Sequence, residues 1–294
     1  MSFKSGFAAL IGKPNVGKST LLNTILAKKI AIATPKPQTT RDNIRGILTT
    51  DDAQIIFIDT PGIHKPKSRL NKMMVQSAYG AAMEADIILF LIDAVKGYGR
   101  SDQIIAEYIA NIDKPKLLII NKIDKLTTRE LIEFLQGINT DEFDEIIPLS
   151  ALRNKNIDEL IATIKSYLTD NVKYYPADMI SDYPQEFMIA EIIREKILIN
   201  TMEEIPHSIA VVIEKMEMKK DVMIINAKIV CERNSQKKII VGRQGMMIKK
   251  IGTFAREELE QRLQRKVFLE LFVAVEENWR NKSQQLKEFG YLDK

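Results

Sequence analysis

One octapeptide constrains the fold of this chain more than any other feature. Residues 12–19 read GKPNVGKS, which fits the pattern G-x-x-x-x-G-K-[ST]. The apolar run FAALI precedes the motif and the helix-like segment STLLNTIL completes and follows it. Glycines let successive backbone N–H groups turn toward phosphate oxygens, and a helix N-terminus adds partial positive charge. The sequence therefore predicts a phosphate-binding loop between a buried strand and a helix.

Two side chains of this loop carry most of its expected chemistry. Lys18 can reach the β- and γ-phosphates of a nucleotide, and the hydroxyl of Ser19 can ligate Mg²⁺. We expect the whole loop and the next residue to contact the nucleotide, namely Gly12, Lys13, Pro14, Asn15, Val16, Gly17, Lys18, Ser19 and Thr20.

A second motif follows the strand-like run at 54–58. Asp59 at the end of such a strand can hold Mg²⁺ through water, and Gly62 leaves its N–H free to meet the γ-phosphate. A lone D-x-x-G is a weak signal, but this one comes about 40 residues after a phosphate-binding loop and at a strand end. We expect nucleotide contacts from Asp59, Thr60, Pro61, Gly62 and Ile63.

A third motif, NKID, follows the apolar run at 117–120 and points to guanine. The carboxylate of Asp124 can accept two hydrogen bonds from the N1–H and the exocyclic amine of guanine, whereas adenine lacks that pair of donors. Lys122 can pack over the base, and Asn121 can tie the base to neighbouring loops. Ser150, Ala151 and Leu152, after the run at 146–149, can offer a backbone N–H to the guanine oxygen.

The apolar runs of the first half indicate an α/β fold. Runs at 7–11, 55–58, 87–92, 117–120 and 146–149 are continuous, as in strands buried on both faces, and helix-like segments at 18–26, 101–112, 128–136 and 157–168 lie among them. This alternation predicts a wound, mostly parallel sheet with flanking helices over residues 1–172.

A second, smaller domain is expected after the linker at 173–184, which reads KYYPADMISDYP. Over 185–294 the pattern predicts a helix at 187–198, strands at 208–215 and 222–230, a strand at 238–241, a helix at 246–263 and a strand at 267–275. The residues MEMKKD are read as the connection between the first two strands. This order is that of a small α+β domain.

Composition excludes some classes of protein and leaves a charge signal. One cysteine excludes an internal disulfide, and two distant histidines with that single cysteine exclude the common zinc sites. The net charge is +4, but residues 228–266 hold 11 basic and 4 acidic residues. Such a local excess marks either a solvated face or an anionic partner.

The residues GRQG at 242–245 lie in this basic stretch and just before the long amphipathic helix. These residues resemble the G-x-x-G loop of a KH domain, which lets a nucleic-acid backbone approach closely. We expect RNA contacts from Gly242, Arg243, Gln244, Gly245, Lys249 and Lys250. Gln244 departs from KH loops that carry a further glycine, which predicts a less close approach of the backbone.

Taken together, the order GKPNVGKS, DTPG, NKID and GRQG resembles the Era/TrmE-like family of GTPases in the form that carries a C-terminal type II KH domain. The resemblance spans essentially the whole chain. It implies a P-loop GTPase domain, Mg²⁺ as cofactor, slow intrinsic hydrolysis of GTP to GDP and phosphate, and 16S ribosomal RNA near its 3′ end and the 30S subunit as partners. It also implies a cytoplasmic location with peripheral contact to the inner face of the cell membrane. No obligate protein partner is implied.

The resemblance further assigns roles within the catalytic site. The segment PQTTR at 37–41 aligns with the first switch. Within it, Thr40 aligns with the threonine that completes the Mg²⁺ shell beside Ser19 and Asp59. The neighbouring Thr39 is the alternative for this role. In similar P-N-x-G-K-S loops the asparagine, here Asn15, helps to bind K⁺. The candidate catalytic residues are Lys18, Thr40, Gly62 and Asn15.

Two questions stay open at the level of sequence. Ile63 stands where many GTPases carry a water-orienting glutamine, so the nucleotide is either hydrolysed as a switch or held as a structural ligand with negligible turnover. If it is hydrolysed, the negative charge of the transition state is neutralised by a K⁺ ion at Asn15, by Arg41 or by a ribosomal group.

Overall fold

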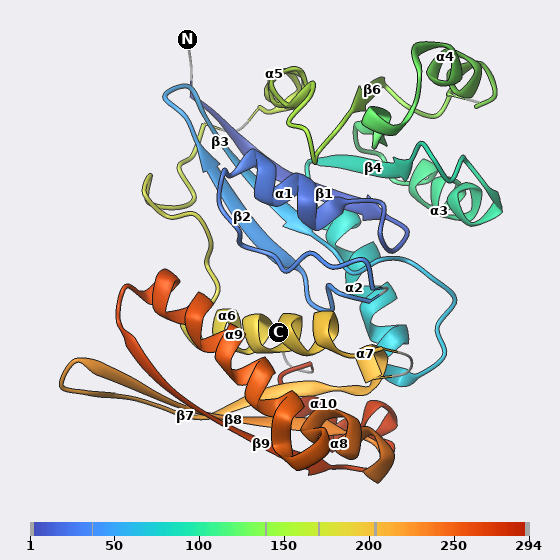
Figure 1. Cartoon of the computed structure of the whole chain (residues 1–294). Helices are drawn as coiled ribbons and strands as arrows, with labels where there is room; N and C mark the ends of the chain where they lie inside the picture. Colours follow the sequence, from blue (N-terminus) through green and yellow to red (C-terminus); the bar gives the residue numbers. More distant parts are fainter. Residues whose placement is uncertain (1–2, 37, 139, 170, 203–204, 292–294) are drawn as a thin grey trace. The chain divides into compact units, whose positions relative to one another are not determined.

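The structure is a computed structural model that describes residues 3–36, 38–138, 140–169, 171–202 and 205–291 (Figure 1). Pro37, the first residue of the predicted switch segment, lies outside the described residues, as does the side chain of His207. The chain separates into two compact units: the second comprises Tyr183–Lys294 together with the short segments Thr34–Gln38 and Lys67–Asn71, and the first comprises the rest. The last boundary between them therefore lies between Asp182 and Tyr183. This point falls inside the predicted linker at 173–184.

The first unit is built on a wound, mostly parallel sheet, as the sequence predicts. Its strands lie in the order β2 (Ile44–Thr49), β3 (Ala53–Asp59), β1 (Lys4–Gly12), β4 (Ile87–Asp93), β5 (Lys116–Asn121) and β6 (Glu145–Leu149). Among the strand pairs that the described residues form in this sheet, β2–β3 alone is antiparallel. Every residue of β3 and β4 is buried, which explains their continuous apolar sequences.

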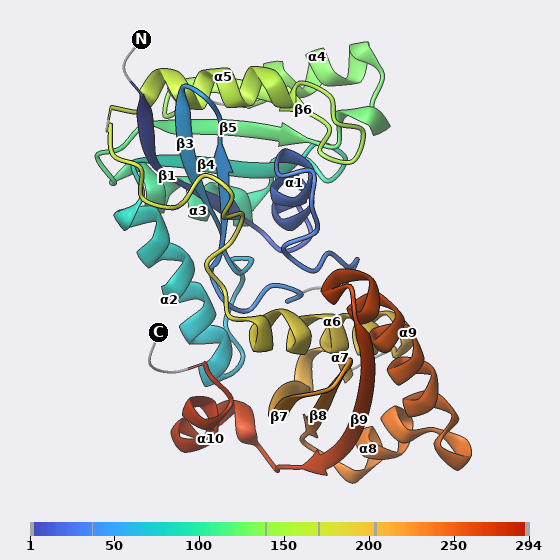
Figure 2. The same cartoon turned by 90° about the vertical axis from the view of Figure 1, so that its left-hand side faces the viewer.

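Helices flank this sheet, as Figure 2 shows from the side. They are α1 (Lys18–Ile25), α2 (Arg69–Glu84), α3 (Arg100–Ala110), α4 (Thr128–Gln136) and α5 (Ile157–Tyr167). Strands β1, β3, β4, β5 and β6 run parallel to one another, so their carboxyl ends share one edge of the sheet. Ligands of such sheets bind at that edge.

The predicted linker is attached to the first unit by several hydrogen bonds. Tyr175 and Gln54 exchange two hydrogen bonds of 2.9 and 3.0 Å, and the N–H of Ile47 donates to the carbonyl of Ile180 at 2.8 Å. Arg45 pairs with Asp182 at 3.0 Å. Up to Asp182, therefore, this segment is packed along β2 and β3.

The second unit has the α+β order of a type II KH domain. Its elements are α6 (Gln185–Asn200), α7 (Ile205–Ser208), β7 (Ala210–Lys219), β8 (Val222–Cys231), α8 (Asn234–Val241), the 3₁₀ turn η2 (Arg243–Gly245), α9 (Met246–Leu263), β9 (Lys266–Val275), η3 (Trp279–Asn281) and α10 (Ser283–Glu288). In the order β7–β8–β9, the first pair is antiparallel and the second parallel.

Two expectations for the second unit are wrong. Residues 238–241, expected as a strand, form the end of helix α8, in which Ile240 faces the core and Gln236 accepts the N–H groups of Glu232 and Arg233. The residues MEMKKD are mostly strand: β7 runs to Lys219 and pairs with β8 beyond a turn at Lys220, whose φ is +50°. Lys219, Lys220 and Asp221 at the turn of this hairpin are exposed, and this run of charged residues hides its strand character in the sequence.

Both units have their own apolar core, and one surface region is also apolar. The core of the second unit includes Ile193, Ile225, Ile251 and Leu259.

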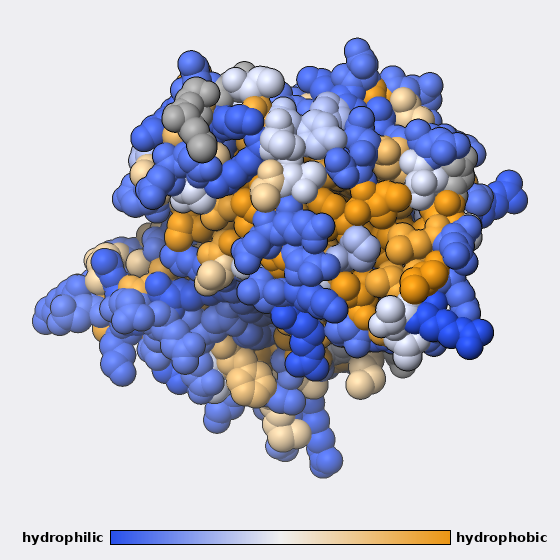
Figure 3. Space-filling view, turned by 90° about the horizontal axis from the view of Figure 1, so that it is seen from above, coloured by the Kyte–Doolittle hydropathy of each residue, from blue (hydrophilic) through white to orange (hydrophobic). Residues whose placement is uncertain are grey.

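Figure 3, which looks from above onto the view of Figure 1, shows hydrophobic residues gathered near the middle of that face within a hydrophilic surround. Such a gathering marks a candidate contact area for a partner. Within the described parts of the chain, none of the helices has the length and apolarity needed to span a bilayer.

Candidate functional site: a nucleotide-binding edge and an exposed G-x-x-G loop

The predicted phosphate-binding loop connects β1 to α1 at the ligand-binding edge of the sheet. Gly12 and Gly17 have φ angles of 151° and 106°, which glycine adopts readily. A Cβ at Gly12 would lie 2.4 Å from the carbonyl oxygen of Leu91, and one at Gly17 would lie 2.2 Å from the side chain of Asn121. Both glycines are therefore required by close packing as well as by their φ angles.

Lys18 is buried at the first position of α1. Its ammonium donates to the carbonyl oxygens of Gly12 and Lys13 at 3.1 and 3.0 Å. Burial lowers the pKa of Lys18 to about 8, although the nearby carboxylate of Asp59 opposes this shift. The ammonium thus lies within the loop, bound to carbonyls that a phosphate can replace.

Ser19, Thr40 and Asp59 meet beside this lysine. The hydroxyl of Ser19 donates to Oδ2 of Asp59 at 2.6 Å and lies 2.9 Å from the hydroxyl of Thr40. Thr40 also donates to Oδ2 of Asp59 at 3.4 Å. The geometry brings the hydroxyl of Thr40 to this cluster and so favours it over that of Thr39.

Asp59 is fully buried in this cluster, and its carboxylate is only half satisfied. Oδ1 has no hydrogen-bond partner among the described residues. Burial raises the pKa of Asp59 to about 6, against the attraction of Lys18 and the hydrogen bonds from Ser19 and Thr40. A buried carboxylate with an unpartnered oxygen is a place where a cation is favourable.

The DTPG segment closes against the phosphate-binding loop. The hydroxyl of Thr60 donates to the carbonyl oxygen of Leu10 at 2.6 Å, and the N–H of Ile63 donates to the carbonyl oxygen of Gly12 at 3.0 Å. A Cβ at Gly62 would lie 2.6 Å from the backbone of Pro14, so no larger residue fits. The side chain of Ile63 is buried in the core of the first unit, where it cannot orient a water molecule.

Asn121 joins the predicted base-binding loops to the phosphate-binding loop. Its side-chain amide donates to the carbonyl of Val16 at 2.8 Å, and its Oδ1 accepts the N–H groups of Lys122 and Ala151 at 2.8 and 3.0 Å. Ala151 in turn accepts a hydrogen bond from Thr24 of α1 at 2.8 Å. Three loops that lie far apart in the sequence are thus held together.

The predicted guanine-reading residues lie on the same edge. Oδ1 of Asp124 accepts a hydrogen bond from the hydroxyl of Ser150 at 2.5 Å, while the Asp124 side chain remains exposed. Lys122 has a φ of 70° and directs its ammonium to the carbonyl of Asn15 at 2.7 Å. Leu152, which follows Ser150 and Ala151 in the chain, is 70% exposed.

The sequence does not predict two acidic residues that help to hold the phosphate-binding loop, one directly and one through Lys122. Oδ2 of Asp93, at the end of β4, lies 2.6 Å from the ammonium of Lys122. Oδ2 of Asp102, in the first turn of α3, lies 2.5 Å from that of Lys13. The position of Asp93 at the end of an apolar run is a usable signal, because neighbouring parallel strands end together. Nothing in the sequence links Asp102 to a residue 89 positions earlier.

In the second unit, the G-x-x-G loop has an unusual backbone. Gly242, Gln244 and Gly245 have φ angles of 75°, 51° and 77°. A Cβ at Gly242 would lie 2.6 Å from the Cβ of Met247, whereas one at Gly245 would meet open space. Gln244 therefore occupies a left-handed position that glycine would adopt without strain.

The predicted RNA-contacting cations are exposed around this loop. Arg243, Lys249 and Lys250 all reach solvent from the turn η2 and the first turn of α9. The ammonium of Lys250 lies 5.9 Å from the ring centre of Phe254, which is 42% exposed. An exposed loop with cations and an aromatic ring beside it can contact a nucleic-acid backbone.

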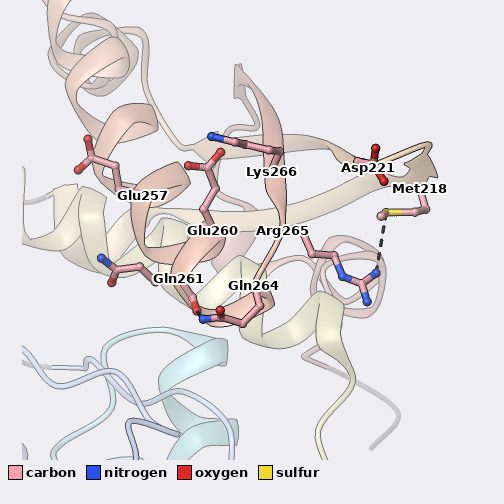
Figure 4. A pocket seen from close by; sticks show the side chains of 8 residues that line it. All are labelled: Met218, Asp221, Glu257, Glu260, Gln261, Gln264, Arg265 and Lys266. Carbon is pink, nitrogen blue, oxygen red and sulfur yellow. Dashed lines mark hydrogen bonds between the residues drawn. The ribbon is translucent and has the colours of Figure 1, made fainter.

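An open cavity of about 960 Å³ in the second unit lies elsewhere (Figure 4). Its lining comes from the end of α9, the start of β9 and the hairpin of β7 and β8: Met218, Asp221, Glu257, Glu260, Gln261, Gln264, Arg265 and Lys266. Acidic and basic side chains are mixed here, and the guanidinium of Arg265 lies 3.9 Å from the sulfur of Met218. The mixture of charges does not favour a polyanion, in contrast to the cationic loop at the other end of α9.

Comparison with known proteins covers both units. The family of 50S ribosome-binding GTPases matches residues 7–122, and the KH domain family matches residues 204–280. A crystal structure of Era in complex with MgGDPNP and nucleotides 1506–1542 of 16S ribosomal RNA is 42% identical to this chain, with a TM-score of 0.95, and the match covers 98% of this chain and 99% of that one.

A second solved structure matches equally well. It is a variant of Aquifex aeolicus Era bound to GDP and AlF4⁻, also 42% identical, with a TM-score of 0.95 and the same coverage of both chains. Identity at this level over nearly the full length of both chains, together with the order of the motifs and the two units, settles the family. The chain belongs to the Era family of GTPases.

Proposed function

We propose that this chain binds GTP with Mg²⁺ at the edge formed by β1, β3 and β5, hydrolyses it slowly, and binds the 3′ end of 16S ribosomal RNA through its KH unit. The observation that carries the nucleotide part is the meeting of Ser19, Thr40 and Asp59 beside the ammonium of Lys18. These residues come from the phosphate-binding loop, the first switch and the DTPG segment. Their convergence is the arrangement that Mg²⁺-dependent nucleotide binding requires.

The donor set fits Mg²⁺. Two hydroxyl groups and a buried carboxylate supply oxygen ligands, which this cation prefers, and Oδ1 of Asp59 has no other partner among the described residues. Ser19 and Thr40 would bind the metal directly, and Asp59 would hold its water shell. When bound, the cation would supply positive charge that offsets the negative charge developing on the phosphates.

We assign recognition of the base to Asp124 and its neighbours. Its exposed carboxylate can accept both guanine donors, while Ser150 holds one of its oxygens in place. The hydrogen bonds of Asn121 hold the loop of Ser150 and Ala151 against the phosphate-binding loop. This arrangement favours GTP over ATP.

Hydrolysis needs a positive charge that neutralises the negative charge of the transition state, and we assign this role to K⁺ bound beside Asn15. Asn15 lies in the phosphate-binding loop with a φ of 65°, and its backbone carbonyl is held by Lys122. Hydrolysis should be faster in K⁺ than in Na⁺ at equal ionic strength, and Asn15→Ala should remove this difference while GTP still binds. Equal rates of the parent in both salts would refute the assignment and favour Arg41 or a ribosomal group.

The RNA part rests on the exposed loop at Gly242–Gly245 and on the Era structure that holds 16S RNA. By the same family relationship we propose a role in assembly and maturation of the 30S subunit, which places the protein in the cytoplasm. Peripheral contact with the cell membrane stays a prediction that rests on the family resemblance alone.

The buried side chain of Ile63 favours one alternative, in which the nucleotide is a structural ligand that is not turned over.

The Mg²⁺ dependence of nucleotide binding tests the proposed site. Binding of a fluorescent GTP analogue to the full chain should weaken when EDTA removes Mg²⁺, and Asp59→Asn should lose most of this dependence. Equal binding with and without Mg²⁺ would contradict the assignment of Ser19, Thr40 and Asp59.

A further inference from the structure

Lys13, the second residue of the phosphate-binding loop, is paired with a buried carboxylate. Its ammonium lies 2.5 Å from Oδ2 of Asp102, whose side chain is 0% exposed, while that of Lys13 is 22% exposed. The two residues belong to different elements, the loop after β1 and the first turn of α3. The charge of Lys13 is therefore largely neutralised by Asp102.

The Asp102 carboxylate depends on this pair. Oδ2 also accepts the N–H of Gly99 at 3.0 Å, which caps the start of α3, whereas Oδ1 is buried with no hydrogen-bond partner in the described part of the chain. Removing one member of a buried ion pair leaves an uncompensated charge in a poorly solvated place. The pair thus fixes the position of Lys13 relative to α3.

Fixing Lys13 also fixes the groups expected to bind the nucleotide. The carbonyl of Lys13 is one of the two acceptors of the Lys18 ammonium, at 3.0 Å. At the other end of this short stretch, the carbonyl of Asn15 is held by Lys122, which pairs with Asp93. Two lysine–aspartate pairs, from the end of β4 and the start of α3, therefore hold residues 13–15 between them.

We infer that Asp102 is a positioning residue for GTP hydrolysis, which acts through Lys13 to hold the backbone of residues 13–15 in the geometry that presents Lys18 and Asn15 to the phosphates. This inference rests on the proposed function, since it requires a nucleotide in the loop. Asp102 itself lies on α3 and touches no reacting group. A displacement of about 1 Å in such groups is enough to slow catalysis by one to two orders of magnitude.

The test compares two substitutions on the same helix. Asp102→Asn removes the charge but keeps an oxygen that can accept the N–H of Gly99, so the start of α3 keeps its cap. Glu107→Gln removes one negative charge from the exposed face of α3 and serves as the matched control. The full chain is loaded with GTP, the complex is isolated, and the single-turnover rate constant is measured per bound nucleotide.

This readout separates positioning from a loss of stability, because unfolded molecules carry no nucleotide and do not alter the rate constant. We expect a decrease of about tenfold or more for Asp102→Asn and the parent rate for Glu107→Gln. A parent-like rate for Asp102→Asn would overturn the inference and leave the proposed function intact. Failure of the parent itself to hydrolyse GTP would overturn both.

Lys13→Met gives a second, independent test and serves if Asp102→Asn folds poorly. If the pair acts as a unit, Lys13→Met alone slows hydrolysis, and the double variant is no slower than the slower of the two single variants. Multiplied effects in the double variant would show that the two residues act separately and would contradict the inference.

Discussion

The side-chain amide of Asn121 donates a hydrogen bond to the backbone carbonyl of Val16 at 2.8 Å, and this contact links the loop expected to read the base to the loop expected to hold the phosphates. A Cβ on Gly17 would collide with the same side chain. Base recognition and phosphate binding therefore depend on one rigid edge of the sheet, and a change at either loop has consequences at the other.

The first prediction concerns the base. Asp124→Asn should weaken GTP binding by about tenfold to a hundredfold, because an amide cannot accept both guanine donors and a hydrogen bond to a charged group contributes about 1.5–3 kcal/mol. Xanthosine triphosphate, which presents an acceptor at the altered position, should gain in affinity. Competition among GTP, ATP and XTP measures this, and an unchanged preference for GTP would remove Asp124 from the site.

A second prediction concerns Lys18 and pH. Burial lowers the pKa of this lysine to about 8, so in the nucleotide-free protein it loses its proton as the pH rises through that value. Only the protonated amine attracts phosphate, so the affinity for GTP should be full near pH 7, where Asp59 with its pKa of about 6 is still ionised, and fall above about pH 8. Titrations with a fluorescent GTP analogue between these values and about pH 9.5 measure the decrease.

Lys18→Ala supplies the control for this titration. It should bind GTP weakly at every pH and should lose the decrease that depends on the lysine, while the second unit stays folded. If this variant binds nucleotide as the parent does, the assignment of the phosphate-binding loop is wrong.

The sequence predicts the nucleotide-binding edge better than it predicts the second unit, and the reason is physical. Phosphate and guanine chemistry fixes particular residue types at short spacing, so GKPNVGKS and NKID are readable without a structure. The run KKIIV, by contrast, is β-branched and suggests a strand, but packing of Ile240 and the hydrogen bonds of Gln236 make it helical. Tertiary contacts override local propensity there.

Other features are invisible because they depend on distant partners. Strand β2 at Ile44–Thr49 exists because it pairs with β3, and its residues alone lack a continuous apolar run. The sequence does not predict the helix α2 at Arg69–Glu84, although Leu70, Met74 and Ala78 are all buried. The pair of Lys13 and Asp102 depends on contact across 89 residues, which no local pattern can reveal.

A third prediction concerns RNA. Replacing Arg243, Lys249 and Lys250 together should weaken binding of a 16S 3′-end oligonucleotide and flatten its dependence on salt, because each lost phosphate contact lowers the slope by about 0.7 for a single strand. Replacing Lys215, Lys219 and Lys220 of the β7–β8 hairpin removes the same charge elsewhere and should retain the slope. Equal slopes for the parent and the loop variant would count against a nucleic-acid groove at this loop.

The two glycines of the loop should differ, and this is a fourth prediction. Gly242→Ala should disturb the loop and weaken RNA binding strongly, since its Cβ would lie 2.6 Å from that of Met247 and its φ is 75°. Gly245→Ala meets open space and suffers only from its φ of 77°, a cost of about 1–2 kcal/mol. Thermal unfolding and RNA titration of both variants measure the difference, and identical effects would contradict the described loop geometry.

The central claim is that the bound GTP is turned over and serves as a switch, despite the apolar Ile63. Single-turnover hydrolysis by the full chain, followed with and without small ribosomal subunits in K⁺ and Mg²⁺, tests it most directly. We predict slow conversion of bound GTP to GDP and phosphate by the chain alone and a faster rate with the subunits. GTP that stays bound and intact over many hours under both conditions would contradict the claim and show that the nucleotide is a structural ligand.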